Sequence, residues 1–188
     1  MIVYRAELPG GETADGDPEG LEFRALGAMD FSRGALFQEK NRARHFEQRL
    51  KIGHRCWGFV TEHGEAVSYL WLSSPRFGTP TAPFELGLTC RIAPRTGYIW
   101  DCRTQTEFRN RGLYRQGLKR LRALCRADGM QSALIASDVL NGASRAGIVG
   151  AGFASDYAMA ILRLLGRYFF IAAHGQILFR TPGKAVDL

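Results

Sequence analysis

The chain has 188 residues, of which 46% are hydrophobic and 23% are charged. This composition is that of an ordinary soluble globular protein and argues against a disordered chain, and the length predicts a single domain, residues 1–188, with a substantial core. The formal net charge of +7 favours anionic partners, which include nucleotide cofactors, acidic carrier proteins, nucleic acid and anionic membrane surfaces.

The N-terminal part of the chain predicts a strand followed by a helix. Residues 2–7 predict a first strand, while residues 22–26 fit either a strand or a short helix. Apolar residues then recur at helical spacing and predict one amphipathic helix, which begins at Asp30 or Ser32 and ends near Gly53. Acidic residues interrupt the Arg and Lys residues of its polar face, so we interpret that face as a solvated surface.

The middle of the chain predicts a β-hairpin. Residues 56–62 and 66–72 are two strand-like runs separated by a glycine turn. Residues 75–94 are rich in proline and glycine and predict a loop, which contains a short strand-like piece at residues 84–88.

The second half of the chain predicts alternating strands and helices. These are, in order, a strand at 97–104, a helix at 114–125, a strand at 132–137 and a short helix at 143–150. The tail, residues 157–179, is strongly apolar, but charged residues divide it into runs that are too short for a transmembrane helix. Two closing strands are predicted there, and contact with a membrane surface is left open.

The cysteine and histidine residues predict neither disulfides nor a metal site. The four cysteines are widely spaced and form no CxxC pair, so buried free thiols are expected at Cys56, Cys90, Cys102 and Cys125. No metal-ligand spacing is found among the histidines, which are expected at the surface or in turns: His45, His54, His63 and His174. No signal peptide pattern opens the chain, so a cytoplasmic location is expected.

The segment from Arg109 to Tyr114 joins the predicted strand at 97–104 to the predicted helix. It reads Arg-Asn-Arg-Gly-Leu-Tyr and contains no acidic residue. A helix N-terminus presents free backbone N–H groups, and a glycine such as Gly112 allows an anion to approach closely. The segment therefore predicts a phosphate site, with an ordinary turn that carries solvated arginines as the alternative.

A second motif follows the strand at 132–137. It consists of Asn141, Ser144, Gly152 and Phe153. The two motifs together, in this order and separated by one helix and one strand, resemble those of the GNAT superfamily of N-acetyltransferases, and the resemblance extends over residues 97–153. It implies an α/β fold of GNAT type, with a mixed, mostly antiparallel sheet flanked by helices.

The resemblance also implies acetyl-CoA, or another acyl-CoA, as co-substrate, with no metal. The pyrophosphate would bind the backbone of Arg109, Asn110, Arg111, Gly112, Leu113 and Tyr114. The pantetheine arm would pair with Cys102, Arg103 and Thr104 of the preceding strand, and Asn141 and Ser144 of the second motif would complete the cofactor site.

Two positions depart from the family pattern. Tyr114 stands where the family favours a small residue, and Ile148 stands where a tyrosine is usual. Ile148 cannot donate a proton, so the leaving thiolate would take one from water, from Tyr114 or from the attacking amine. Tyr98 stands where several family members carry a basic glutamate.

Two carboxylates are candidates for the base that accepts the proton of the amine, Asp101 in the predicted strand and Glu85 in the preceding loop. A structural hydrogen-bonding role is equally open for Asp101. The candidate catalytic residues are therefore Asp101, Tyr98 and Glu85.

These residues predict an N-acyltransferase, which transfers an acetyl group from acetyl-CoA to an amine of a small molecule or of a sugar or envelope precursor. A non-catalytic module that binds acyl-CoA or an acyl carrier protein is the alternative, which the isoleucine at position 148 suggests. Nucleic acid is a disfavoured partner, because no aromatic stacking motif accompanies the basic residues. The oligomeric state is not predicted.

Overall fold

The fold is described from a computed structural model, which covers residues 1–8, 16–33, 35–37, 42–84, 88–164, 167–172, 177–180 and 185–187. The strands within these ranges are β1 (Ile2–Glu7), β2 (Leu21–Leu26), β3 (Arg55–Thr61), β4 (Ser68–Ser73), β5 (Thr81–Pro83), β6 (Thr89–Arg91), β7 (Thr96–Thr104), β8 (Ser132–Ser137), β9 (Ala154–Leu164), β10 (Arg167–Ala172), β11 (Ile177–Arg180) and β12 (Ala185–Asp187). The α-helices are α1 (Ala28–Arg33), α2 (Arg42–Ile52), α3 (Leu113–Ala127) and α4 (Gly142–Gly150).

Nine of the described strands form one sheet, in the order β11-β10-β9-β1-β8-β7-β4-β3-β2. Neighbouring strands of this sheet are antiparallel except for β7 and β8, which run parallel. Three short strands form a second sheet, in the order β12-β6-β5. The expected fold class, a mixed and mostly antiparallel sheet flanked by helices, is confirmed.

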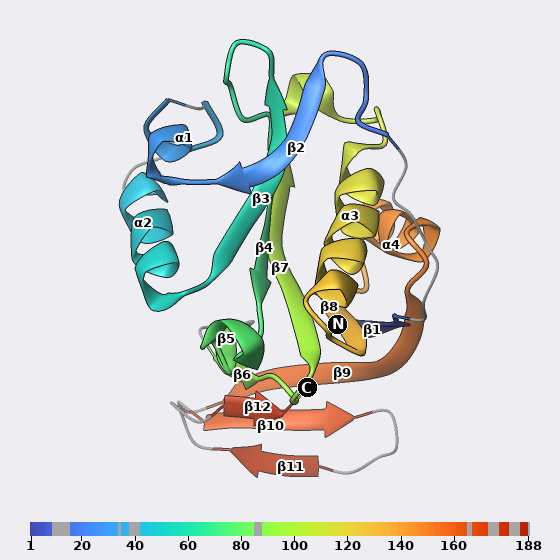
Figure 1. Cartoon of the computed structure of the whole chain (residues 1–188). Helices are drawn as coiled ribbons and strands as arrows, with labels where there is room; N and C mark the ends of the chain where they lie inside the picture. The colour runs from blue at the N-terminus through green and yellow to red at the C-terminus, as the bar shows by residue number, and fades with distance from the viewer. Residues whose placement is uncertain are drawn as a thin grey trace.

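Helices cover both faces of the large sheet. Figure 1 shows α1 and α2 on one face of β3, β4 and β7, and α3 and α4 on the opposite face. Side chains alternate along the strands between these two layers. In β7, Tyr98 and Trp100 join the core on the α1 and α2 face, whereas Ile99 joins the core under α3 and α4.

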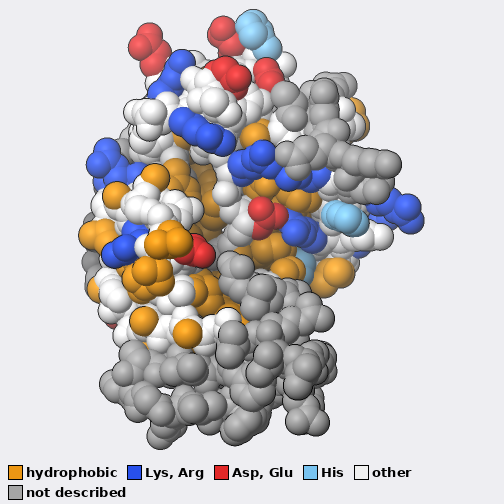
Figure 2. Space-filling view, turned by 180° about the vertical axis from the view of Figure 1, so that it is seen from behind, with side chains coloured by type: hydrophobic (Ala, Val, Ile, Leu, Met, Phe, Trp, Pro, Cys, Tyr) orange, Lys and Arg blue, Asp and Glu red, His pale blue; other side chains and the backbone are white. Residues whose placement is uncertain are grey.

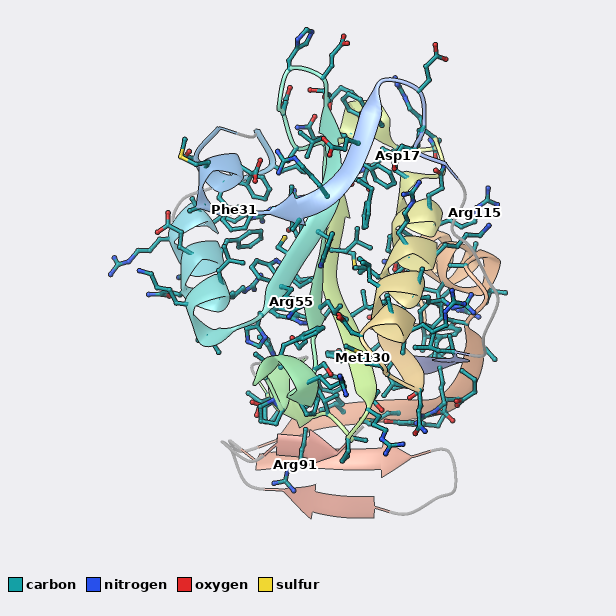
Figure 3. The ribbon with its side chains drawn as sticks, viewed as in Figure 1. Asp17, Phe31, Arg55, Arg91, Arg115 and Met130 are labelled. Carbon is teal, nitrogen blue, oxygen red and sulfur yellow. The ribbon has the colours of Figure 1, made fainter. Side chains whose placement is uncertain are left out.

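An aromatic cluster forms the core beneath α1 and α2. The Phe31 ring of α1 lies 5.2 Å from the Phe46 ring of α2 and 5.1 Å from that of Phe37, between centroids. Figure 3 shows Phe31 turned inward from α1, toward α2 and the sheet. Aromatic pairs at these distances stabilise a core by more than the burial of their apolar surface alone would.

This cluster explains why the prediction of one long helix from Asp30 to Gly53 is wrong. Phe31 and Phe46 would be about 22 Å apart along a continuous helix, given a rise of 1.5 Å per residue. Instead α1 ends at Arg33, a 3-10 turn follows at Ala35–Phe37, and α2 begins at Arg42. Two short helices therefore fold back on each other and bring their phenylalanines into one cluster.

Most of the other predicted elements are confirmed, with two differences, which are the closing strands and the loop at 75–94, where the structure has β5 and β6 at 81–83 and 89–91. Residues 21–26 are a strand, which settles the ambiguity there, and the hairpin of β3 and β4 is present. The prediction of two closing strands is wrong, because β9, β10 and β11 all extend the large sheet beyond β1. Of the predicted strand-like piece at 84–88, residues 85–87 lie outside the described ranges.

The expectation for the cysteines is confirmed, since all four are free thiols, although Cys102 is only partly buried. No helix in the described ranges is both long enough and apolar enough to cross a membrane.

Candidate active site at the divergence of β7 and β8

The parallel strands β7 and β8 separate halfway along β7. Their pairing runs from Thr96 and Ser132 to Ile99 and Ile135, and the described residues show no pairing between them beyond that point. On the other side of β7, the pairing with β4 is irregular at the same place, because Trp71 pairs with Trp100 but Tyr69 pairs with Arg103. Two β7 residues, Asp101 and Cys102, thus stand opposite one residue of β4, which is a β-bulge.

The bulge interrupts the alternation of side chains along β7, so that Asp101 lies on the same side of the sheet as Trp100, and Cys102 lies on the other side. Asp101 has a φ of +42°, in the left-handed region that most side chains avoid. Its side chain lines a cavity on the side of α2, while Cys102 lines a cavity on the side of α3 and α4. The two cavities therefore reach the same point of β7 from opposite faces.

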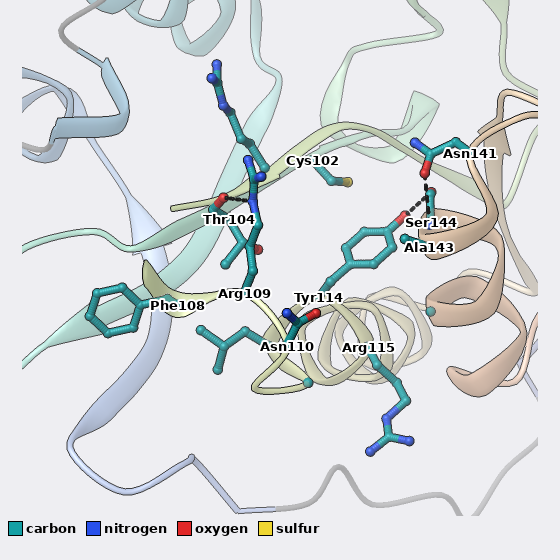
Figure 4. Close-up of a pocket in the computed structure, with 14 residues that line it drawn as sticks. Cys102, Thr104, Phe108, Arg109, Asn110, Tyr114, Arg115, Asn141, Ala143 and Ser144 are labelled. Atoms are coloured by element: carbon teal, nitrogen blue, oxygen red, sulfur yellow. Dashed lines mark hydrogen bonds between the residues drawn. The ribbon is translucent and has the colours of Figure 1, made fainter. Parts of the chain in front are cut away.

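The cavity on the α3 and α4 side has a volume of about 530 Å³. It lies between the end of β7, the start of α3 and the start of α4 (Figure 4). The lining residues are Cys102, Arg103, Thr104, Phe108, Arg109, Asn110, Gly112, Leu113, Tyr114, Arg115, Asn141, Ala143, Ser144 and Gly147. Three of these are arginines and none is acidic, so the cavity is suited to an anion.

The start of α3 forms one wall of this cavity. Gly112 is the N-cap residue with a φ of +75°, which glycine adopts without strain, and no side chain caps the helix. The first N–H groups of a helix have no acceptor within it, so a bound anion can accept their hydrogen bonds. These groups and the arginines fit the pyrophosphate of coenzyme A.

The arginines around this helix start are not equivalent. Arg109 donates from Nε to the Thr104 carbonyl oxygen at 3.3 Å, which holds it against the end of β7. Arg115 is exposed and points outward from α3 near α4 (Figure 3). Arg111 stacks on the Phe108 ring at 4.9 Å and is not among the lining residues. Figure 2 shows that a band of Lys and Arg side chains crosses one face of the molecule, around exposed hydrophobic surface.

The second motif of the sequence builds the opposite wall. The Asn141 Oδ1 atom accepts a hydrogen bond from the Ser144 backbone N–H at 3.0 Å, which caps α4. The Ser144 hydroxyl lies 3.2 Å from the Tyr114 hydroxyl. Burial, together with the neighbouring Cys102, raises the pKa of Tyr114 above its usual value, although the hydrogen bond with Ser144 acts the other way. Tyr114 therefore stays protonated.

The cavity on the α2 side has a volume of about 280 Å³. Aromatic side chains and one pair of opposite charges dominate its lining, which consists of Arg49, Pro83, Phe84, Tyr98, Trp100, Asp101 and Ala136. Ala136 lies on β8 just beyond its last pair with β7, so this cavity also opens at the divergence of the two strands.

Both carboxylate oxygens of Asp101 have a partner. Arg49 of α2 donates to Oδ2 at 2.5 Å, and the Tyr69 hydroxyl donates to Oδ1 at 3.3 Å. Burial and the charge of Asp101 raise the pKa of Tyr69, so its hydroxyl remains a donor. The Arg49 guanidinium also lies over the Trp100 ring, 4.6 Å from its centroid. The carboxylate is thus held in one orientation at the floor of the cavity.

Trp100 is itself held by a buried polar chain. Its indole N–H donates to the Ser73 hydroxyl at 2.7 Å, and His54 Nδ1 lies 2.7 Å from the same oxygen. His54 follows Gly53 in the turn between α2 and β3, but it does not lie at the surface, because it is only 6% exposed. Burial and the charge of Arg49 lower the pKa of His54, so its ring is neutral near pH 7.

Comparison with known proteins identifies the family. The model of the Acetyltransferase (GNAT) family matches residues 24–146. The chain belongs to the GNAT family of acetyltransferases. A search of the curated proteins found no match. The similar solved structures support the fold.

Three solved acetyltransferase structures illustrate that similarity. An acetyltransferase from Trypanosoma brucei is 20% identical with a TM-score of 0.54, and the match covers 77% of this chain and 99% of that one. Glucosamine-6-phosphate N-acetyltransferase from Arabidopsis thaliana is 14% identical with a TM-score of 0.52, covering 78% and 99%. Ribosomal-protein-S5-alanine acetyltransferase from Vibrio fischeri is 13% identical with a TM-score of 0.57, covering 81% and 90%. At these identities the likeness concerns the fold alone.

The structure of this GNAT protein separates the residues expected from its sequence into two groups. Those expected at the cofactor lie around the larger cavity, apart from Arg111. Tyr98 and Asp101 lie together in the smaller cavity, and Glu85 lies outside the described residues.

Sequence reasoning missed Arg49 and Trp100 in the smaller cavity. The face of α2 that carries Arg49 was interpreted as solvated, yet Arg49 is packed on aromatic rings. Its position three residues after the buried Phe46 is the signal that could have placed it on the inner face.

Proposed function

We propose that this GNAT protein is an acyl-CoA-dependent N-acyltransferase, which transfers the acetyl group of acetyl-CoA to an amine of a small molecule. The observation that carries the proposal is that two cavities on opposite faces of the sheet are lined by neighbouring residues of β7, Cys102 and Asp101. A thioester that enters through one cavity and an amine that enters through the other would be brought into contact there, and such positioning is a large part of the catalysis of acyl transfer.

The larger cavity is the proposed acyl-CoA site. Its pyrophosphate would accept hydrogen bonds from the backbone N–H groups at the start of α3, near Gly112. The pantetheine arm would lie along Cys102, Arg103 and Thr104, where the β7 edge facing β8 has no strand partner among the described residues. Asn141 would contact the arm through its side-chain amide, whose oxygen also caps α4.

The smaller cavity is the proposed acceptor site. The attacking amine must be neutral and must lose a proton as the amide forms. Asp101 is proposed to receive this proton, directly or through a water molecule, while Arg49 and Tyr69 hold its carboxylate in place. Tyr98 and Trp100 would form the apolar wall on which the rest of the acceptor lies.

The structural neighbours do not agree on an acceptor. The names of two of them specify glucosamine 6-phosphate and the alanine of ribosomal protein S5. The acceptor proposed here is therefore limited to an amine small enough for the cavity beside Asp101, and an amino sugar or an envelope precursor belongs to this class.

Calorimetry with acetyl-CoA, followed by a screen of amines for release of free thiol, tests the proposal. A charge reversal at the cavity mouth, Arg115→Glu, is expected to weaken acetyl-CoA binding about tenfold, which corresponds to about 1.4 kcal/mol. Arg44→Glu is the matched control, because Arg44 is exposed on α2 and carries the same charge. It should leave the affinity unchanged.

Two results would contradict the proposal. If acetyl-CoA does not bind, or if both charge reversals weaken binding equally, the larger cavity is not its site. If acetyl-CoA binds but no amine releases thiol at any pH, the protein is a binding module for acyl-CoA or an acyl carrier protein instead of an enzyme.

A further inference from the structure

The Tyr114 ring reaches the cavity by packing directly against Gly147 of α4. The ring extends from α3 across this glycine, and a Cβ built on Gly147 would lie 2.6 Å from the ring atom Cδ1. Any larger residue at position 147 would displace the ring, so the glycine and the tyrosine form a matched pair. Figure 4 shows the ring directed toward Ser144 and Asn141, with Cys102 on the same side of the cavity.

Helix α4 itself supplies no phenol to this place. Ile148 is 0% exposed and packs in the core beneath α3 and α4. Among the described residues that line the cavity, Tyr114 is the only one with a phenolic hydroxyl. We propose, on the basis of the proposed function, that the Tyr114 hydroxyl donates a hydrogen bond, and then its proton, to the sulfur of coenzyme A as the thioester bond breaks.

Every bond and proton of this transfer is accounted for. The amine nitrogen forms a bond with the thioester carbonyl carbon and loses a proton to Asp101 or to water, and the carbon–sulfur bond breaks with its electron pair on sulfur. The thiolate takes the proton of the Tyr114 hydroxyl and becomes the thiol of free coenzyme A. The tyrosinate regains a proton from the Ser144 hydroxyl at 3.2 Å, and Ser144 is replenished by water, because its side chain is partly exposed.

The surroundings of Tyr114 keep it in the donor form. Cys102 from β7 and Ser144 from α4 face its ring, and the charged groups that line the same cavity are Arg103, Arg109 and Arg115. Burial raises the pKa of the phenol, so it carries its proton throughout the neutral range.

Titration of the thiol of bound coenzyme A tests this role without any acceptor. The thiolate absorbs in the ultraviolet, so its formation can be followed against pH on the protein, with desulfo-coenzyme A as the blank. A hydrogen bond to a charged group is worth about 1.5–3 kcal/mol, which corresponds to about one to two pH units. The bound thiol should therefore titrate about one to two units higher on Tyr114→Phe than on the wild type.

Two further variants complete the experiment. Gly147→Ala should displace the ring and raise the titration as Tyr114→Phe does, which covers the case in which Tyr114→Phe is unstable. Tyr157→Phe is the matched control, because Tyr157 lies on β9 and is not among the lining residues of the cavity. It should titrate like the wild type. With an acceptor in hand, Tyr114→Phe should lower kcat about 100-fold with little change in coenzyme A affinity.

The results separate this inference from the function on which it rests. Failure of the wild type to bind coenzyme A overturns both. Binding with the same thiol titration in the wild type and in Tyr114→Phe overturns only the role of Tyr114 and leaves the acyltransferase standing. An equal shift in Tyr157→Phe also overturns it, because the effect would then not depend on the cavity.

Discussion

Replacing Asp101 by asparagine separates its chemical role from its structural role. Asparagine keeps the shape of the side chain and tolerates left-handed backbone, so it suits the φ of +42° at this position. It removes the negative charge that faces Arg49. If Asp101 accepts the proton of the amine, Asp101→Asn should lower turnover about 100-fold or more, with nearly unchanged affinity for acetyl-CoA.

The expected change in stability is much smaller. The side chains of Arg49 and Asp101 are 24% and 35% exposed, so solvent screens their attraction considerably. Ion pairs of this kind contribute about 1 kcal/mol or less to the free energy of unfolding. Asp101→Ala should cost about 1 kcal/mol more than Asp101→Asn, because alanine is strained in the left-handed region.

Denaturant unfolding measures the stability of each variant, calorimetry measures its affinity for acetyl-CoA, and a thiol-release assay measures its turnover. Both variants lack the carboxylate, so the reasoning requires a similar loss of turnover in both, despite their different stabilities. Wild-type turnover in Asp101→Asn would remove Asp101 from the mechanism. A loss of turnover confined to Asp101→Ala would assign the role to the backbone of the bulge.

Three further predictions concern the cofactor and the core. Gly112→Val should strongly weaken the binding of coenzyme A measured by calorimetry, because valine is strained at a φ of +75°. Gly64→Val is the control, because Gly64 has a φ of +81° in the distant hairpin turn. It should lower the stability by a similar amount and leave the affinity for coenzyme A unchanged. The affinity for coenzyme A should fall as salt rises, since exposed arginines are screened within about 10 Å at ordinary ionic strength, and duplex DNA that competes with coenzyme A at physiological salt would contradict this. Burial and the charge of Arg49 lower the pKa of His54 in the folded protein. As the pH falls below about 6.5, the unfolded chain therefore binds a proton at His54 before the folded protein does. The free energy of unfolding should decline over this range, until the pH reaches the lowered pKa. Unfolding free energies measured from pH 7 to pH 5 should decline less in His54→Gln, and equal declines would refute the reasoning.

Much of the lining of the larger cavity could be predicted from the sequence because its residues are close together in the chain. The turn that ends in Gly112 and the helix start at Asn141 each lie within one short segment, and their hydrogen bonds are local, such as that between Asn141 and Ser144. Runs of apolar, aromatic and β-branched residues likewise predicted the strands β3, β4, β7 and β8. Local features of this kind can be predicted from short stretches of sequence.

The lining of the smaller cavity was decided by tertiary structure. Arg49 and Asp101 are 52 positions apart, and no periodicity links them. Their meeting depends on the break between α1 and α2, which the aromatic cluster imposes by pulling Phe31 and Phe46 together. The buried position of His54 likewise involves partners distant in sequence, since Ser73 lies on β4 and Trp100 on β7.

The sequence by itself therefore determined the strands β3, β4, β7 and β8, the starts of α3 and α4 and the turn at Gly112, because local residue patterns specify each of them. Only the fold decided that β7 bulges at Asp101, that Tyr114 crosses Gly147 toward Ser144, and that neighbouring residues of β7 line two cavities on opposite faces of the sheet. Those features arise from the packing of side chains that are distant in sequence, and the order of residues alone does not specify which of them come into contact.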